Sequence, residues 1–127
     1  MANAESNIQA RIMMALAKAG ARGFRNNSGL GWAGKAEKIN QTREVTVYPG
    51  DVVVRNARPL HAGLGEGSPD LVGWTPGGLF RGVEVKTKKG RPSKEQSNWI
   101  DAIRVAGGRA GIARSPEEAV EIACGRP

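Results

Sequence analysis

The sequence predicts an α/β fold: a small mixed β-sheet flanked by helices, in the order helix, three strands, helix, strand, helix. Three observations lead to this prediction. They are an amphipathic stripe near the N-terminus, two strand patterns joined by a turn in the middle, and two capped helical patterns around a short apolar strand at the end. The length of 127 residues suits one domain. We therefore expect residues 1–127 to form a single domain, with an insertion over about residues 28–67.

The first half of the chain predicts one helix, one strand and a long irregular segment. Apolar residues recur at helical spacing over residues 5–19, and a short strand is expected over residues 23–27. Residues 28–67 are rich in glycine and lack helical periodicity. Within them, alternating valines flank a Pro-Gly pair, so we expect a hairpin over residues 45–54 with a type II turn at its tip.

The middle of the chain predicts two paired strands. Residues 70–74 and 79–87 can each form a strand, and the Thr-Pro-Gly-Gly sequence between them is typical of a turn. The two strands are therefore expected to fold back on each other as a hairpin.

The last third predicts a helix, a strand and a second helix. Ser93 can cap the first helix, and Gln96 three residues later completes a capping box. Two glycines end this helix before a short apolar strand over residues 109–113. Ser115 opens the last helix, with proline at its first position and Glu118 in the capping-box position.

Positive charge dominates the composition. Nineteen Lys and Arg residues against twelve Asp and Glu residues give a formal net charge of +7. Such an excess favours a polyanionic partner, of which nucleic acid is the commonest. The loop after Lys86 is the candidate DNA-binding segment, and ordinary surface charge on a solvated loop is the alternative. Its basic residues are Lys88, Lys89, Arg91 and Lys94.

The sequence gives no sign of membrane insertion or secretion. No apolar run approaches the roughly 20 residues that span a bilayer, and no signal-peptide core follows Met1. A cytoplasmic location is therefore expected. Cys124 is the only cysteine, which excludes an internal disulfide, and its place in a helical segment suggests that it packs against the core.

Two conspicuous features are expected to carry no chemistry. Residues 29–34 match G-x-G-x-x-G and are followed by lysine, as in a P-loop, but Ala36 has no hydroxyl to hold Mg²⁺ and no amphipathic helix follows. We therefore expect no nucleotide cofactor. His61 is the only histidine, which argues against a histidine-rich metal site or a Ser-His-Asp triad, and it is expected to be exposed.

The residues that can carry chemistry are Asp70, Glu84 and Lys86. Glu84 and Lys86 are two positions apart on one strand and so share a face, and the predicted hairpin brings Asp70 close to Glu84. Mg²⁺ prefers carboxylate oxygens and water, so the two acids are candidate ligands, with the carbonyl of Val85 as a third. Mn²⁺ is expected to substitute. Lys86 can orient the attacking water and stabilise the phosphate, either as a charge or as a base. The alternative is a solvated Glu-Lys pair on a strand, with Asp70 as a cap after Pro69.

These residues resemble the PD-(D/E)xK nuclease superfamily, in which Pro-Asp on one strand and Glu-x-Lys on the next hold the metal and the water. More specifically, the chain resembles the VRR-NUC (virus-type replication-repair nuclease) domain over about residues 5–26 and 67–120. The residues that carry the resemblance are Gly67-Ser-Pro-Asp70, Glu84-Val-Lys86, Gln96, Trp99 and Gly107-Gly108. The resemblance implies a restriction-endonuclease-like core (α-β-β-β-α-β-α), to which this chain adds the Gly-rich insertion.

The resemblance also implies two further site residues. A glutamate on the first helix of the family enters the site, and Glu5 matches it as a candidate catalytic residue and metal ligand. A carboxylate that only favours the helix dipole is the alternative for Glu5. The family's glutamine matches Gln96, whose alternative role is to cap its helix.

The function that the resemblance implies is a Mg²⁺-dependent DNA endonuclease. It would be selective for branched DNA such as Holliday junctions, act as a homodimer, and be encoded by a phage or mobile element in a bacterial cell. Two other functions stay open: a less selective or restriction-like endonuclease, and a basic DNA-binding module without turnover. Within the insertion, basic residues and Trp32 could line a DNA groove or complete a dimer interface.

Overall fold

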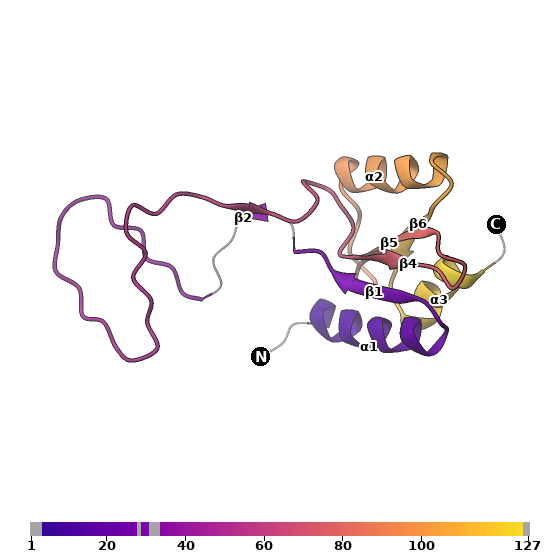
Figure 1. Ribbon diagram of the computed structural model, residues 1–127, viewed down its shortest axis with the longest axis horizontal. Coiled ribbons are helices and arrows are strands. Elements are labelled where there is room, and N and C mark those ends of the chain that lie inside the picture. The colour runs from indigo at the N-terminus through magenta and orange to yellow at the C-terminus, as the bar shows by residue number, and fades with distance from the viewer. Residues whose placement is uncertain (1–3, 28, 31–33, 126–127) are drawn as a thin grey trace.

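The computed structural model describes residues 4–27, 29–30 and 34–125. Among these residues, the helices and strands follow the predicted order, with one additional pair of very short strands in the insertion (Figure 1). Trp32, and with it the centre of the G-x-G-x-x-G sequence, lies outside the described residues. In chain order the elements are α1 (Ala4–Lys18), β1 (Arg22–Arg25), β2 (Gly29–Leu30), β3 (His61–Ala62), β4 (Leu71–Trp74), β5 (Phe80–Val85), α2 (Lys94–Val105), β6 (Arg109–Ala113) and α3 (Pro116–Cys124).

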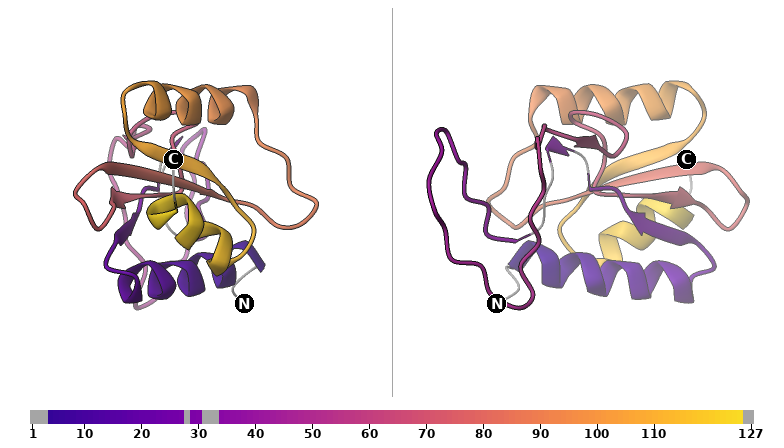
Figure 2. Two further views of the ribbon diagram at one scale, coloured as in Figure 1. Left: turned by 90° about the vertical axis from the view of Figure 1, so that its right-hand side faces the viewer. Right: turned by 60° about the vertical axis from the view of Figure 1, so that its left-hand side comes forward.

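The main sheet has the strand order β1-β4-β5-β6. β1 pairs with β4 and β4 with β5 in antiparallel fashion, whereas β5 and β6 are parallel because α2 lies between them in the chain. The prediction of a small mixed sheet flanked by helices is therefore confirmed. α1 and α3 lie on one face of this sheet and α2 on the other (Figures 1 and 2).

The larger hydrophobic core lies between the sheet and the helices α1 and α3. Every residue of β5 after Phe80 is buried. Val83 and Val85 belong to this core, so strand alternation directs Glu84 to the opposite face, toward α2. The core consists of Ile12, Leu16, Ala21, Leu71, Val83, Val85, Ala113, Ala119 and Ala123. A second, smaller cluster holds α2 against the sheet through Ile100, Ile103 and Ala110.

One cation is buried with the larger core. Arg81 is completely inaccessible to solvent, and its Nη2 donates to the backbone carbonyl of Arg22. Its other two guanidinium nitrogens have no partner among the described residues. Burial lowers the pKa of Arg81 to about 10, so it remains charged at neutral pH.

Both predicted helix starts in the last third of the chain are observed. Ser93 caps α2, and both hydrogen bonds of its capping box with Gln96 are present. Ser115 caps α3 by accepting from the backbone N–H of Glu118. The Glu118 carboxylate accepts from the backbone N–H of Arg114 instead of that of Ser115. The return hydrogen bond of this second capping box is therefore made one residue earlier in the chain.

The hairpin expected over residues 45–54 is wrong, although its turn forms. The backbone N–H of Asp51 donates to the carbonyl of Tyr48 over 2.9 Å, and Gly50 has the positive φ of 96° that a type II turn requires. The flanking residues form no strands, and every residue from 34 to 60 is exposed. A two-stranded hairpin is marginal without a surface to pack on, and Figure 1 shows this segment reaching away from the helices and the main sheet.

The insertion is instead paired at its two ends. β2 and β3 form a two-stranded antiparallel sheet in which Leu30 is opposite His61. His61 is exposed, as expected. Cys124, which we expected to pack, is exposed at the end of α3 because the inward positions of that helix are taken by Ala119 and Ala123. None of the described helices is long and apolar enough to cross a membrane.

Candidate active site

Asp70 and Glu84 lie opposite each other at one end of the β4–β5 hairpin. Leu71 pairs with Val83, and the next position along each strand holds one of the two acids. The backbone N–H of Val85 donates to Oδ2 of Asp70 over 2.9 Å. The turn over residues 75–78 closes the hairpin, with the N–H of Gly78 donating to the carbonyl of Thr75 over 3.0 Å. The tight turn and the register of the two strands therefore bring the two carboxylates together.

Glu84 is an acid held inside the protein. Its side chain is 2% exposed, and Oε1 accepts a hydrogen bond from Nε2 of Gln96 over 3.0 Å. Nζ of Lys86 lies 3.8 Å from the same oxygen, and the Lys86 side chain is only 17% exposed. The second carboxylate oxygen, Oε2, is buried without a hydrogen-bond partner among the described residues. An unsatisfied carboxylate oxygen inside a protein is costly, so it calls for a cation or a proton.

The electrostatics around Glu84 favour the proton when no cation is bound. Burial raises the pKa of Glu84 to about 8, helped by the neighbouring carboxyl group of Asp70 and by the charge of Glu5. Lys86 opposes this shift. Two carboxylates at close range repel when both are ionised, and a divalent cation between them removes that repulsion.

The donor set fits a hard divalent cation. Asp70 and Glu84 offer carboxylate oxygens, of which one buried oxygen lacks any other partner among the described residues. Mg²⁺ is commonly held by one or two carboxylates with water completing its shell. Within the described part of the chain, no three Asp, Glu, His or Cys side chains gather closely enough to form a larger metal cluster.

The remaining predicted site residues lie around this pair. Gln96 combines both roles considered for it, since its Oε1 accepts from the Ser93 N–H over 2.8 Å while its Nε2 contacts Glu84. Glu5 is half-buried in the first turn of α1, close enough for its charge to affect Glu84. The structure therefore brings Asp70, Glu84, Lys86 and Gln96 into one cluster, with Glu5 acting on it through charge.

The predicted DNA-binding loop follows directly after Lys86. Lys88, Lys89, Arg91 and Lys94 are all exposed. The backbone of this loop is nevertheless held in one conformation, because Nη1 of Arg114 donates to the carbonyls of Thr87 and Gly90, each over 2.8 Å. Fixed backbone and exposed cations suit a phosphate-binding surface beside the carboxylate pair.

Asn26 was not identified from the sequence and is a clear candidate for positioning Asp70. Its Nδ2 donates to Oγ of Ser68 and to the carbonyl of Pro69, over 2.8 and 2.9 Å. Its Oδ1 accepts from the N–H of Leu64, and its own N–H donates to the carbonyl of Asp70. One side chain thus holds the whole segment that leads into Asp70. These hydrogen bonds join residues about 40 positions apart, so no local pattern could have revealed them.

Gly67 has a similar supporting role, and its place in the Gly-Ser-Pro-Asp sequence was the available signal. Its φ is +82°, and a Cβ there would lie 2.6 Å from the backbone carbon of Glu95 in α2. The loop and the start of α2 therefore fit together only without a side chain. Nε1 of Trp99 adds a hydrogen bond to the carbonyl of Glu66 over 2.9 Å.

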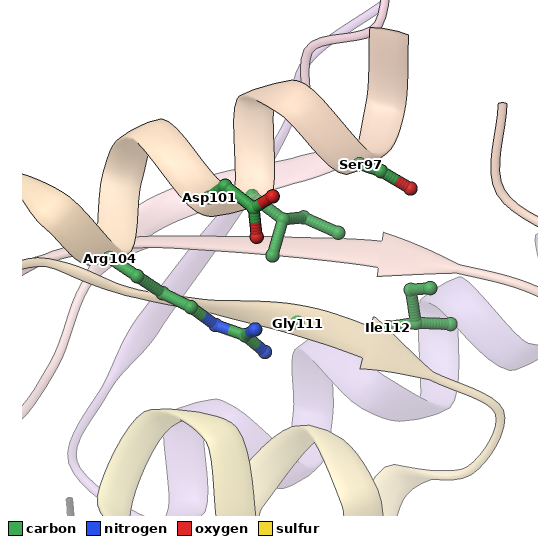
Figure 3. Close-up of a pocket in the computed structure, with 6 residues that line it drawn as sticks. Ser97, Asp101, Arg104, Gly111 and Ile112 are labelled. Carbon is green, nitrogen blue, oxygen red and sulfur yellow. The ribbon is translucent and has the colours of Figure 1, made fainter. Parts of the chain in front are cut away.

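The structure also has a shallow hollow away from these residues. It lies between α2 and β6, and none of the predicted site residues lines it (Figure 3). Its polar lining comes from Ser97, Asp101 and Arg104 of α2, and Nε of Arg104 is engaged with the carbonyl of Ala110. The chemistry of the carboxylate cluster makes that cluster the stronger candidate for an active site.

Comparison with known proteins agrees with this geometry. Searches of curated proteins and of solved structures give no match. The family model of the VRR-NUC domain matches residues 3–117, which include the whole carboxylate cluster and the basic loop. The chain therefore belongs to the VRR-NUC domain family, a family of nucleases.

Proposed function

We propose that this protein is a metal-dependent endonuclease that hydrolyses phosphodiester bonds in DNA at the cluster of Asp70, Glu84 and Lys86. The observation that carries the proposal is the buried Glu84 carboxylate, which has one oxygen without a partner among the described residues and faces a second carboxylate and a lysine. This combination is expensive in a purely structural role and useful for binding a cation and a phosphate.

Mg²⁺ is the proposed ion, with Mn²⁺ as a substitute, and Asp70 and Glu84 are the proposed ligands. The carbonyl of Val85 is proposed as an additional ligand. Glu5, expected as a further ligand, does not gather with Asp70 and Glu84 into a group of three among the described residues, so we propose that it acts on the site through its charge. When bound, such an ion neutralises charge on the phosphate and lowers the pKa of water. The N–H of Val85 fixes one oxygen of Asp70 by a hydrogen bond and so sets the orientation of this carboxylate beside Glu84.

Lys86 and Gln96 have separate tasks in the proposed mechanism. Lys86 places its ammonium group 3.8 Å from Glu84, where it can orient the attacking water and stabilise the negative charge that develops on the phosphate. Gln96 holds Oε1 of Glu84, so that the carboxylate keeps one orientation when the ion and the substrate bind. The backbone of Ser93 fixes Gln96 in turn.

The proposed substrate is branched DNA, such as a four-way junction, and the proposed assembly is a homodimer. The net charge of +7 and the exposed cations of the loop after Lys86 suit a DNA backbone. A two-fold dimer would place one site on each of two opposed strands and so make two symmetric cuts.

Cleavage of a labelled four-way junction and a matched linear duplex tests this function. With Mg²⁺, wild type should make symmetric cuts in the junction, and EDTA should abolish them. Lys86→Ala should retain binding but lose several orders of magnitude in rate, because the charge acts on the transition state. Equal cutting of both substrates would refute junction selectivity. Binding without any cutting in Mg²⁺ or Mn²⁺ would refute the nuclease activity and leave a DNA-binding module.

A further inference from the structure

Three aromatic side chains form an exposed row across the main sheet, which we call the aromatic surface: Phe24 of β1, Trp74 of β4 and Phe80 of β5. Their exposed fractions are 51%, 47% and 45%. Trp74 is the direct strand partner of Phe80, and the rings of Phe24 and Trp74 lie 5.4 Å apart at 51°. The three side chains therefore meet as one patch.

This patch lies on the same face of the sheet as the candidate active site. Phe80 and Glu84 are four positions apart on β5, so strand alternation directs both away from the core of α1 and α3. On this face α2 packs against β5 and β6. The aromatic surface lies toward β1 and β4, beyond the part that α2 packs on.

Exposure of these residues is unusual for their chemistry. Phe24 and Phe80 are the only two phenylalanines of the chain, and such side chains gain more than most from burial. Contiguous exposed apolar groups of this kind commonly mark a binding surface.

The charge around the patch indicates what binds it. The sequence has no Asp or Glu from Ser6 to Ala36, nor from Leu71 to Val83. Arg22 of β1 is exposed and is the strand partner of Trp74, so it lies on the same face as the rings. An isologous contact with a second copy would bring this arginine toward its own copy without an acid of β1 or β4 to pair with it. A nucleic acid strand instead offers a phosphate to the arginine and base faces to the rings.

We propose that the aromatic surface stacks against unpaired bases of the DNA strand that is cut. This inference rests on the proposed function and adds the structural feature of the substrate that the protein would recognise. At about 3.3 Å per strand residue, Phe80 lies roughly 13 Å from Glu84. That distance corresponds to about four stacked nucleotides at roughly 3.4 Å each. The preferred substrate therefore has unpaired bases about four nucleotides from the scissile phosphate.

The test measures DNA affinity in EDTA, so that binding is read without cleavage. The probes are a dye-labelled fork with unpaired arms, a fully paired duplex of the same length, and the same fork with abasic sites in its arms. Trp74→Leu keeps an apolar side chain but removes the ring, whereas Trp74→Phe keeps a ring and is the matched control. We expect Trp74→Leu to bind the fork roughly 5- to 150-fold more weakly, and Trp74→Phe to bind nearly as wild type does. Trp74→Leu and wild type should bind the duplex with the same affinity. They should also bind the abasic fork with the same affinity, because its arms offer no bases to stack on the ring.

Two results would overturn the proposal. One is an equal loss of affinity of Trp74→Leu for fork and duplex. The other is an unchanged affinity of Trp74→Leu for the fork, and a fall in its molar mass by light scattering in that case would assign the surface to a second copy. The proposed function can be refuted independently of this proposal. If wild type binds the fork through Trp74 but cuts no DNA in Mg²⁺ or Mn²⁺, the aromatic surface is a DNA-binding surface and the proposed nuclease activity is refuted.

Discussion

Replacing Glu84 by glutamine should stabilise the metal-free protein at alkaline pH. Glutamine has the shape of a protonated glutamate, so it can keep the hydrogen bond from Gln96 and remain uncharged beside Asp70. Wild type must instead ionise a buried carboxyl whose pKa is raised from 4.5 to about 8. The variant therefore removes the cost of burying this charge without emptying the space.

The sign and size of the effect follow from proton binding. Between pH 4.5 and 8 the folded state holds a proton on Glu84 that the unfolded state has lost, so the stability of wild type falls as pH rises through this window. One pKa unit is worth about 1.4 kcal/mol. The two proteins should be about equally stable near pH 4.5, and the variant should be more stable by at most about 4 kcal/mol at pH 8.

Urea unfolding followed by circular dichroism at several pH values in EDTA measures this difference. Mg²⁺ or Mn²⁺ should stabilise wild type, by about 2.7 kcal/mol at one hundred times the dissociation constant, and should have little effect on Glu84→Gln. Parallel pH curves for the two proteins would refute the reasoning, because they would show that ionising Glu84 carries no such cost. Equal stabilisation of both by the metal would remove Glu84 from the ligand set.

Three further predictions concern the residues around the cluster. Asn26→Ala should lower the unfolding free energy by only about 1–3 kcal/mol, but it should raise the Mg²⁺ concentration needed for cleavage at least about tenfold, because the segment leading into Asp70 loses its anchor. Replacing Lys88, Lys89 and Arg91 together by alanine should flatten the salt dependence of DNA binding, by about 0.9 in logarithmic slope for each phosphate that is no longer neutralised. Gly67→Ala should destabilise the protein by roughly 1–3 kcal/mol in thermal unfolding, since its Cβ would meet the backbone of α2.

Matched controls separate these effects from general damage. Gly77→Ala is the control for Gly67, because its Cβ would meet only Oγ1 of Thr75 at 3.9 Å, and it should be nearly neutral. Lys18→Ala removes one exposed cation from the end of α1 and should leave the salt slope almost unchanged. An Asn26→Ala protein with unaltered Mg²⁺ dependence would show that this side chain stabilises the loop without positioning Asp70.

Much of the fold follows from local signals in the sequence. Ser93 and Ser115 mark the starts of α2 and α3 because a serine side chain can satisfy backbone N–H groups at a helix start. The strand over Arg109–Ala113 was predicted with its observed bounds, since its apolar residues lie between a glycine pair and a capping serine. The β4–β5 pairing follows from the short turn over residues 75–78.

The insertion shows where local signals are insufficient. The Pro-Gly turn forms, which is a property of the two residues themselves. The flanking valines do not pair, and Val52 is 83% exposed. Alternation of apolar residues predicts a strand only when another surface is present to bury them, and the sequence of the segment does not specify such a surface.

The candidate site was predicted where its residues share a strand or a hairpin. Asp70, Glu84 and Lys86 are brought together by the register of two neighbouring strands. The role of Asn26 was not predicted from the sequence, because its hydrogen bonds reach from the end of β1 to the loop before β4. The aromatic surface was not predicted either, because its three rings come from three different strands that only the folded sheet brings together.

The most direct test of the central claim is DNA cleavage by wild type and Asp70→Asn, in Mg²⁺ and in EDTA. Asparagine can still accept the hydrogen bond from Val85 N–H, so the variant keeps the geometry of the hairpin and loses only the carboxylate charge. The proposed mechanism predicts Mg²⁺-dependent cleavage by wild type and a loss of at least about a thousandfold in rate for the variant, with DNA binding retained. Cleavage by Asp70→Asn at the wild-type rate, or cleavage by wild type in EDTA, would contradict a metal-dependent active site at this carboxylate pair.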